Sequence, residues 1–387
     1  MAYLNTILSQ LLVHMPRHEF QSLVSRWKAD RYVKRFTTWN QLVTLIYAQA
    51  GDKKSLRDIQ NGLAAHAPQL YHLGFEGPVA RSTMSDANTS RDWHVFQGIF
   101  LALLSRCRAL SPKHKFKFKN PLKTLDSTVI DLCLSMYPWA KYRQTKGALK
   151  LHCMLDHAGD IPTFVVVTDG KCSDIRAVKT HFSPVPDSIY CFDRGYTDYG
   201  FFYRIQEADA FFVTRTKVTM QARVIGQQER SKNKAILADQ TIELLGQLSK
   251  EKYSSPLRRI RFYDDENNRT FEFLTNNFVL PAATIAAIYK ARWQIEAFFK
   301  WIKQNLKIKT FLGVSKNAVL AQVWVALCYY LLLAYIKFQT KYRFSLFYLH
   351  RLIRETLLER LSLIDLLGLK EASLPKVRDK MQLCFGF

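Results

Sequence analysis

Two hydrophobic periodicities divide the chain. Up to about residue 110, apolar residues recur every three or four positions, as at Leu42, Ile46, Ile59 and Leu63, which is the spacing of an amphipathic helix. From Leu122 onward, short β-favouring runs alternate with helical stretches. The sequence therefore predicts an α/β class of fold, with an all-helical domain over residues 1–110 in front of a mixed sheet.

The helical region contains a cluster of polar side chains. One helix is expected over residues 55–70, the stretch 74–78 ends it, and a second is expected from near Ser82 toward Leu104. A helix that enters a DNA groove carries its base-reading residues on its first turns. Polar residues lie there in this chain: Arg81, Ser82, Thr83, Ser85, Asn88 and Arg91. A helical bundle with a solvated polar face explains the same pattern, and both interpretations remain open at this level.

Residues 111–121 alternate lysine with phenylalanine between two prolines. In an extended segment the lysines share one side and the phenylalanines share the other. The lysines are Lys113, Lys115, Lys117 and Lys119. The segment is interpreted either as a basic linker that lies along phosphates or as a solvated edge strand protected by lysine.

The α/β region shows a regular order of elements: three strands, a helix, a strand, a helix and a strand. A more polar stretch at 217–280 predicts a β-rich insertion, and a long helix is expected from Pro281 to about Leu306. The region 311–387 is expected to be helical to about residue 367. The predicted strands and helices lie at 122–133, 149–159, 162–170, 174–181 (helix), 188–193, 198–207 (helix), 210–216, 240–245, 257–263 and 270–275.

One segment, residues 318–336, is almost wholly apolar and about long enough to cross a bilayer. Trp324, Tyr329, Tyr330 and Tyr335 lie within it, whereas a membrane span tends to keep such residues at its ends. The segment is therefore interpreted as a buried core helix, with no membrane partner.

Charge and cysteine content narrow the class of protein. The 387 residues include 56 Lys or Arg and 32 Asp or Glu, which gives a formal net charge of +24. The 48% of hydrophobic residues predicts a folded protein. The positive net charge predicts a polyanionic partner, and the candidates are nucleic acid or an anionic membrane. Seven cysteines without a C-x-x-C pair indicate a reducing compartment. Phosphate-loop, zinc-protease and serine-hydrolase motifs are missing, so the commonest hydrolase templates lose their support.

Two aspartates stand where chemistry is expected. Asp126 lies in the middle of the first predicted strand, where a buried carboxylate is costly unless it is paired, protonated or bound to metal. Asp193 follows an apolar strand, at the sheet edge where α/β proteins gather functional side chains. Taken alone, Asp193 is equally consistent with an ordinary turn residue before Gly195.

Further acids in this region compete for a metal-binding role. On a strand, Asp131 is expected on the opposite face from Asp126, because the two are an odd number of residues apart. Three more are expected to form turns at strand ends, and the histidines show no ligand spacing. The competing acids are Asp131, Asp156, Asp160, Asp169 and Asp174.

The long helix carries a polar stripe. At 100° per residue, Tyr289, Arg292, Glu296 and Lys303 fall within an arc of about 60°, away from the apolar face. A solvated face with an i,i+4 pair between Arg292 and Glu296 accounts for this stripe on its own. The spacing Tyr-x2-Arg-x3-Glu-x6-Lys, however, resembles the Y-R-E-K signature of the insertion-sequence-four group of bacterial transposases.

The resemblance extends over residues 122–310 and implies an RNase H-like catalytic domain with a β-rich insertion. It implies an acidic catalytic triad on the first strand, after the fourth strand and on a following helix. Those positions are Asp126, Asp193 and Glu296. The helical region before the catalytic domain also resembles that of one branch of these enzymes, which implies that it binds transposon ends.

The resemblance also implies the chemistry. The three carboxylates are expected to hold two Mg²⁺ ions, with Mn²⁺ as a substitute, for hydrolysis at the ends and for 3′-hydroxyl strand transfer. Tyr289, Arg292 and Lys303 are expected to hold DNA phosphates. The implied partners are double-stranded DNA, as terminal inverted repeats and target, and a second copy of the chain. The implied location is the bacterial cytoplasm, in association with the nucleoid.

One departure from the group concerns an aromatic residue. Some relatives stack a flipped base on a tryptophan of the β insertion, and this chain has no tryptophan between Trp139 and Trp293. Tyr263, Phe271 or Phe273 are possible replacements, because any aromatic ring offers a stacking face.

Two rival functions share the charge or the fold: an idle DNA-binding protein derived from a transposase, and a structure-selective nuclease.

Overall fold

The computed structural model describes residues 5–141, 147–229, 231–306, 308 and 310–368. The chain folds into two compact units. One comprises Met1–Ser111 together with Asn305–Phe387, and the other comprises Pro112–Gln304. The sequence predicted separate helical regions at the two ends of the chain, whereas the structure packs their helices into a single unit.

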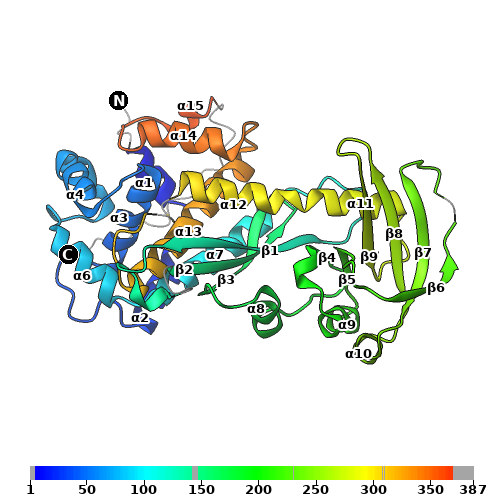
Figure 1. Cartoon of the computed structure of the whole chain (residues 1–387). Coiled ribbons are helices and arrows are strands. Elements are labelled where there is room, and N and C mark those ends of the chain that lie inside the picture. The colour runs from blue at the N-terminus through cyan, green and yellow to red at the C-terminus, as the bar shows by residue number, and fades with distance from the viewer. Residues whose placement is uncertain (1–4, 142–146, 230, 307, 309, 369–387) are drawn as a thin grey trace. The chain divides into compact units, whose positions relative to one another are not determined.

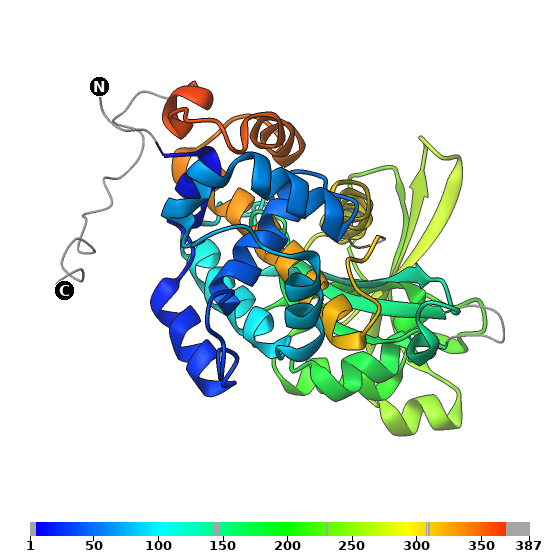
Figure 2. The ribbon, with the colours of Figure 1, turned by 90° about the vertical axis from the view of Figure 1, so that its left-hand side faces the viewer.

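The first unit is helical and is built around one apolar helix, α13 (Lys316–Thr340). Nearly all of its residues from Ala318 to Ile336 are buried, among the helices coloured blue and cyan in Figure 2. Ser315 caps its start by accepting a hydrogen bond from the Ala318 N–H at 3.1 Å. By length and composition α13 is the one helix among the described residues that could cross a membrane, but 94% of its most apolar window is buried inside the protein. This burial confirms the interpretation as a core helix.

The other helices of this unit are shorter than α13. The helix expected over 55–70 and the one expected from Ser82 toward Leu104 are each divided in the structure, the second at Arg91–Trp93. The helices are α1 (Ile7–Leu12), α2 (Arg17–Arg26), α3 (Thr38–Ala50), α4 (Leu56–Ala65), α5 (Ala67–Leu70), α6 (Arg81–Ser90), α7 (His94–Leu110), α14 (Leu346–Thr356) and α15 (Leu363–Leu366). Of these, α3, α6, α7 and α14 pack against α13.

The second unit is a nine-stranded sheet in the order β3-β2-β1-β4-β5-β9-β8-β7-β6. Strands β1, β2 and β3 are antiparallel neighbours, whereas β4 runs parallel to both β1 and β5. This arrangement of the first five strands is the RNase H-like fold, as predicted. The strands are β1 (Leu122–Leu132), β2 (Gly147–Asp156), β3 (Ile161–Asp169), β4 (Ile189–Phe192), β5 (Phe211–Arg215), β6 (Ala222–Gln227), β7 (Ile236–Leu244), β8 (Leu257–Asp264) and β9 (Arg269–Thr275).

The β-rich insertion continues the same sheet through β9, which pairs with β5. Strand β6 was not predicted: its side chains are half-buried or exposed, so it lacks the apolar run that marked the other strands. The short helix α10 (Gln247–Lys252) connects β7 to β8 (Figure 1).

Alternation along β4 shows how the sheet builds two cores. Tyr190 and Phe192 pack in a cluster with residues of α8 (Asp174–His181) and α9 (Tyr199–Glu207). Ile189 and Cys191, on the opposite face, pack in a second cluster with α11 (Ala282–Ala291). Because side chains alternate along a strand, each face of the sheet buries its own helix layer (Figure 1).

The basic segment before β1 follows the predicted alternation without forming a strand. Its four lysines are exposed, whereas Phe116 and Phe118 pack against the α11 core. The phenylalanines therefore fix the segment to the second unit and leave the lysines in solvent.

Candidate active site

Asp126 lies in the middle of β1, opposite Cys153 of β2. Leu122 belongs to the core beneath α11, and residues 124 and 126 share its face by alternation. The Asp126 carboxylate is therefore on the α11 side of the sheet, where the Ser127 N–H donates to its Oδ1 at 2.8 Å. Its side chain is only 19% exposed, so it needs a cationic or hydrogen-bonding partner.

Asp193 reaches the same place from the neighbouring strand. The parallel register of β1 and β4 pairs Leu125 with Phe192, so the next residues on the two strands are Asp126 and Asp193. Both lie on the α11 face. The Asp193 Oδ1 accepts the Gly195 N–H at 2.7 Å, and a Cβ at position 195 would lie 2.8 Å from that oxygen. Glycine at position 195 therefore allows the close turn that holds the carboxylate.

Glu296 is joined to Asp126 through an arginine. The expected long helix is divided into α11 and α12 (Trp293–Asn305), and the break falls at Arg292. The Arg292 side chain is buried: its Nη1 donates to Asp126 Oδ2 at 3.0 Å, and its Nη2 donates to Glu296 Oε1. The predicted i,i+4 pair exists, but its Arg292 end is buried and also contacts Asp126, so the pair is not a solvated surface pair.

The carboxylates act on one another electrostatically. Burial raises the pKa of Asp126 to about 6, and the negative charges of Asp193 and Glu296 add to this rise. The Ser127 N–H and the Arg292 guanidinium oppose it. A site in which several acids raise one pKa and a single cation offsets them attracts further positive charge.

The side chains present fit a hard divalent cation. The three acids offer oxygen atoms alone, which are the ligands that Mg²⁺ prefers. In this arrangement the Arg292 guanidinium lies between Asp126 and Glu296. Over the described residues, no group of three His, Cys, Asp or Glu side chains is placed closely enough to hold a metal ion. The carboxylates therefore match a metal site in the chemistry of their oxygen atoms, while Arg292 contacts two of the three.

The competing acids mostly have structural roles. Asp156 accepts the Ala158 N–H at 2.9 Å, Asp169 accepts two backbone N–H groups at 3.0 Å, and Asp160 has a left-handed φ of 55°. These features confirm the turn interpretation. Asp131 is exposed near the end of β1.

Asp174 has a role that the sequence did not indicate. It starts α8 and contacts Lys150 Nζ at 2.8 Å and His152 Nδ1 at 3.3 Å. Hydrogen bonds from His152, Lys150 and Ser127 outweigh burial and lower the pKa of Asp174. Because Ser127 follows Asp126 on β1, this network supports the strand from the face opposite the acidic site.

The remaining residues of the polar stripe lie apart. The Tyr289 ring is 9% exposed and packs 4.9 Å from the Phe273 ring, within the α11 core. Lys303 is half-buried, about 10 Å further along α12 than Glu296. The structure thus brings Arg292 and Glu296 to Asp126, whereas Tyr289 contributes mainly its buried ring.

An aromatic cavity opens beside Tyr289 and Arg292. Its volume is about 490 Å³, and Phe271, Phe273 and Trp293 are among its lining residues. Of the three aromatics considered as replacements for the insertion tryptophan, Phe271 and Phe273 line it and Tyr263 does not. The Arg215 guanidinium lies 4.8 Å from the Phe271 ring centre. Sequence reasoning missed Arg215, because nothing local marks it.

The sheet order and the placement of these acids define an RNase H-like protein. Residues 118–332 match the family described as Transposase DDE domain, and residues 4–76 match a domain of unknown function, DUF4372. The chain thus belongs to the DDE transposase family and is a bacterial transposase that cleaves and joins DNA.

Two relatives in sequence are described as transposases. The chain is 35% identical to "Putative transposase y4zB" of Sinorhizobium fredii, over 65% of this chain and 69% of that protein. It is 27% identical to "Probable transposase for insertion sequence element IS5377" of Geobacillus stearothermophilus, over 67% and 68%. A solved piggyBac transposase synaptic complex with hairpin DNA has a TM-score of 0.47 at 9% identity, over 97% of this chain and 84% of that one.

Proposed function

We propose that Asp126, Asp193 and Glu296 are the catalytic triad and together hold two divalent metal ions, Mg²⁺ or Mn²⁺. Members of this family use divalent metal ions. One observation carries the assignment: the β1–β4 register sets Asp126 beside Asp193, and Arg292 joins Asp126 to Glu296. When bound, the ions stabilise the attacking and leaving oxygens and lower the pKa of an attacking water.

The protein's own residues position the DNA. In our proposal Arg292 leaves the two carboxylates when metal enters and turns its planar guanidinium to a phosphate oxygen, which it contacts through two N–H groups. Lys303 binds a phosphate further along α12, and Tyr289, which lines the aromatic cavity, offers its hydroxyl to a phosphate. The substrates are the terminal inverted repeats and a target duplex, which the freed 3′-hydroxyl attacks. A homodimer bridges the two ends, in the cytoplasm and on the nucleoid.

The end-processing reaction has a direct test. Purified protein with Mg²⁺ is incubated with a duplex that carries the inverted repeats flanking its coding region. We expect 3′-hydroxyl ends at the repeat boundary and joined products with a target plasmid. Cleavage without joining would support a structure-selective nuclease instead of this assignment.

Arg292→Ala lowers strand transfer by about 10- to 100-fold, because a charge-assisted contact to phosphate contributes roughly 1.5–3 kcal/mol. Metal affinity does not fall, since the variant removes the cation that competes for the carboxylates. Strand transfer and Mn²⁺ titration by calorimetry check the two parts. Lys300→Ala, an exposed cation on the same helix, serves as the control. Wild-type strand transfer by Arg292→Ala would refute the phosphate role.

The pKa of Asp126 predicts a dependence of stability on pH. In the metal-free protein its pKa of about 6 lies above the ordinary value of 3.8. The folded protein therefore favours the protonated form of Asp126 more than the unfolded chain does. This contribution to the free energy of unfolding is fully present below pH 3.8 and is lost as the pH rises through 6. Asp126→Asn lacks this loss and gains up to about 3 kcal/mol relative to wild type between pH 4 and 7. Urea unfolding at both pH values measures it, and an unchanged difference would contradict the raised pKa.

The aromatic cavity is proposed to receive a base displaced from the transposon end. Stacking on an aromatic ring contributes about 1–3 kcal/mol per base. Phe271→Ala therefore raises the fluorescence of a 2-aminopurine placed at the terminal position and slows end cleavage by about 5- to 100-fold. Tyr263→Ala, outside the cavity, is the control. Equal fluorescence in wild type and Phe271→Ala would exclude this cavity as the binding place.

A further inference from the structure

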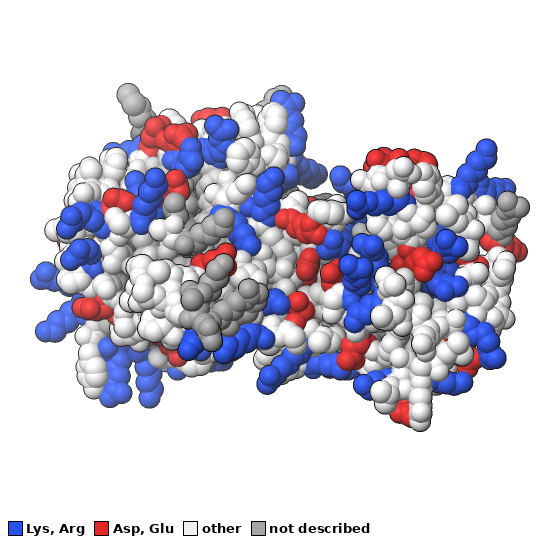
Figure 3. Space-filling model, viewed as in Figure 1, with Lys and Arg blue, Asp and Glu red and all other residues white. Residues whose placement is uncertain are grey.

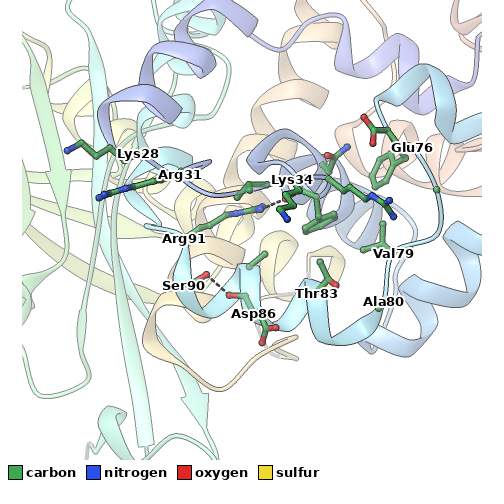
Figure 4. A pocket seen from close by; sticks show the side chains of 18 of the residues that line it. Lys28, Arg31, Lys34, Glu76, Val79, Ala80, Thr83, Asp86, Ser90 and Arg91 are labelled. Carbon is green, nitrogen blue, oxygen red and sulfur yellow. Dashed lines mark hydrogen bonds between the residues drawn. The ribbon is translucent and has the colours of Figure 1, made fainter.

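A groove in the helical unit is a hollow that the active site does not explain. It lies between the loop 27–36 and helix α6, is also lined by residues 75–80, and has a volume of about 1280 Å³ (Figure 4). We call it the α6 groove. Small-molecule pockets hold about 300–1,000 Å³, so the α6 groove exceeds that size and is open to solvent.

The loop that forms one wall is rich in cations without acidic partners. Lys28, Arg31, Lys34 and Arg35 line the groove and are exposed. Within the described chain, none of these four forms an ion pair with a carboxylate. Asp30, the acid in the same loop, is engaged elsewhere: it accepts the Thr38 N–H at 2.6 Å and the Thr38 hydroxyl at 2.7 Å. The four charges therefore repel one another until an anion binds.

One end of the loop is anchored to the residue after α6. The buried Arg91, directly after α6, donates to the backbone oxygens of Phe36 and Thr37. Lys28 and Tyr32 have left-handed φ angles of 48° and 63°, which non-glycine residues adopt when surrounding contacts impose them. Anchoring one end reduces the conformational freedom that the cationic loop loses when it binds.

The opposite wall differs in chemistry. The exposed Thr83, Asp86 and Ser90 line it at helical spacing along α6 and offer short hydroxyl and carboxylate groups (Figure 4). Two residues predicted as base readers do not take part. Asn88 is buried and accepts a hydrogen bond from Gln41 at 2.9 Å, and Arg91 is used in the loop contacts. The polar face that remains consists of small side chains at the helix surface.

We infer that the α6 groove binds double-stranded DNA, with the loop 27–36 on a sugar–phosphate strand and α6 toward base edges. The different chemistry of the two walls supports this inference, since phosphate contacts position a duplex and base contacts specify its sequence. Asp86 is suited to accept from the amino group of cytosine or adenine. The inference rests on the proposed DNA-joining function and assigns a ligand to the region that matches the domain of unknown function.

The shape and charge of the groove favour DNA over an acidic protein segment. Lysines and arginines outnumber acids over the whole chain, with a formal net charge of +24, and many of them are visible in Figure 3, so a polyanion is attracted to the protein in general. An acidic peptide would find no use for Asp86, which would repel it. A duplex offers both phosphates for one wall and amino groups for the other.

The test uses the full-length chain as Asp126→Asn, so that DNA is bound without being cut. The binding variant is Lys28→Ser/Arg31→Ser/Lys34→Ser, and the control is Lys54→Ser/Arg57→Ser/Arg108→Ser, three exposed cations of the same unit outside the groove. The probe is a fluorescent 30-base-pair duplex of mixed sequence, titrated at several salt concentrations. The binding variant lowers affinity at least about tenfold, and its slope of log K against log salt is shallower by about 2–3.

Each outcome bears on a separate claim. Affinity and slope in the binding variant equal to those of the control would overturn the inference. If a poly-glutamate peptide lost affinity for the binding variant while the duplex did not, the groove would take an acidic protein segment and the inference would fall. Failure of the parent chain to bind any duplex would instead remove the proposed function. Circular dichroism melting confirms that these surface variants fold.

Asp86 tests the second half of the inference. Asp86→Asn converts an acceptor into a group that can also donate, so we expect altered base preference at one or two positions in a selection from random duplexes. Overall affinity for mixed-sequence DNA stays within about threefold. Thr89→Ala, exposed on α6 outside the groove, leaves the preference unchanged. An Asp86→Asn preference identical to the parent would contradict the placing of α6 toward base edges.

Discussion

Asp126→Asn abolishes DNA cleavage and strand transfer, with an expected loss of about 10³-fold or more, and leaves DNA binding intact. The substitution keeps the shape of the side chain and removes its negative charge, so a metal ion loses its central ligand while the fold is kept. Electrostatic stabilisation of the transition state is the largest single contribution to many enzymatic reactions, which is why the effect is large.

A gel assay of end cleavage, with binding measured on the same duplex, checks this result. Glu296→Gln and Asp193→Asn are expected to behave in the same way. Asp131→Asn, an exposed acid of the same strand, is the matched control and keeps full activity. Retained turnover by Asp126→Asn would remove the triad assignment altogether.

Removal of divalent metal ions stops the reaction as completely as the loss of Asp126. Protein dialysed against a chelator is expected to bind DNA without cutting it, and Mg²⁺ restores cleavage. Binding of an ion to the folded chain alone also raises stability, by about 2.7 kcal/mol at a concentration of 100 times the dissociation constant. The melting temperature of wild type therefore rises with added Mg²⁺.

The same melting experiment separates a specific site from general ion effects. In Asp126→Asn the rise is lost, whereas in Asp131→Asn it is kept. An equal rise in both variants would show that the ion binds elsewhere, and cleavage in the presence of excess chelator would contradict the metal requirement.

The fold was predictable where local pattern decides it. Strands β1, β3, β4 and β5 and helix α8 follow from short apolar runs between turn residues, and their order indicates a mixed sheet. The RNase H-like fold was implied by the family resemblance. Strand β6 was missed because it is exposed, and the break at Arg292 was missed because the helical periodicity continues through it. The packing of the N- and C-terminal helices into one unit depends on contacts between distant segments, which no local pattern records.

The candidate site was predictable in its acids but not in its cation. Asp126 and Asp193 stood out as carboxylates at strand positions, and Glu296 stood out through its spacing from Arg292. The contact of Arg292 with Asp126 joins residues 166 positions apart, so only the folded chain reveals it. The Y-R-E-K resemblance itself remains a prediction about a narrower group within the family.

In the helical domain, the sequence drew attention to polar residues of α6 but not to the cations of the neighbouring loop. The polar residues before and within α6 attracted notice as a group, but burial divides them: Asn88 and Arg91 hold the structure together, and Thr83 faces the groove. The cations of the loop 27–36 were not singled out, because a basic loop is ordinary in a chain of net charge +24. They are notable because none of the four forms an ion pair with a carboxylate in the described structure.

Soaking crystals of the protein with Mn²⁺ and recording anomalous diffraction tests whether Asp126, Asp193 and Glu296 share a metal site. The account predicts an anomalous peak within about 2.0–2.3 Å of an Asp126 oxygen, in reach of Asp193 or Glu296, with the Arg292 guanidinium displaced from both carboxylates. Mn²⁺ bound at saturating concentration only elsewhere, with Arg292 still bridging Asp126 and Glu296, would contradict it.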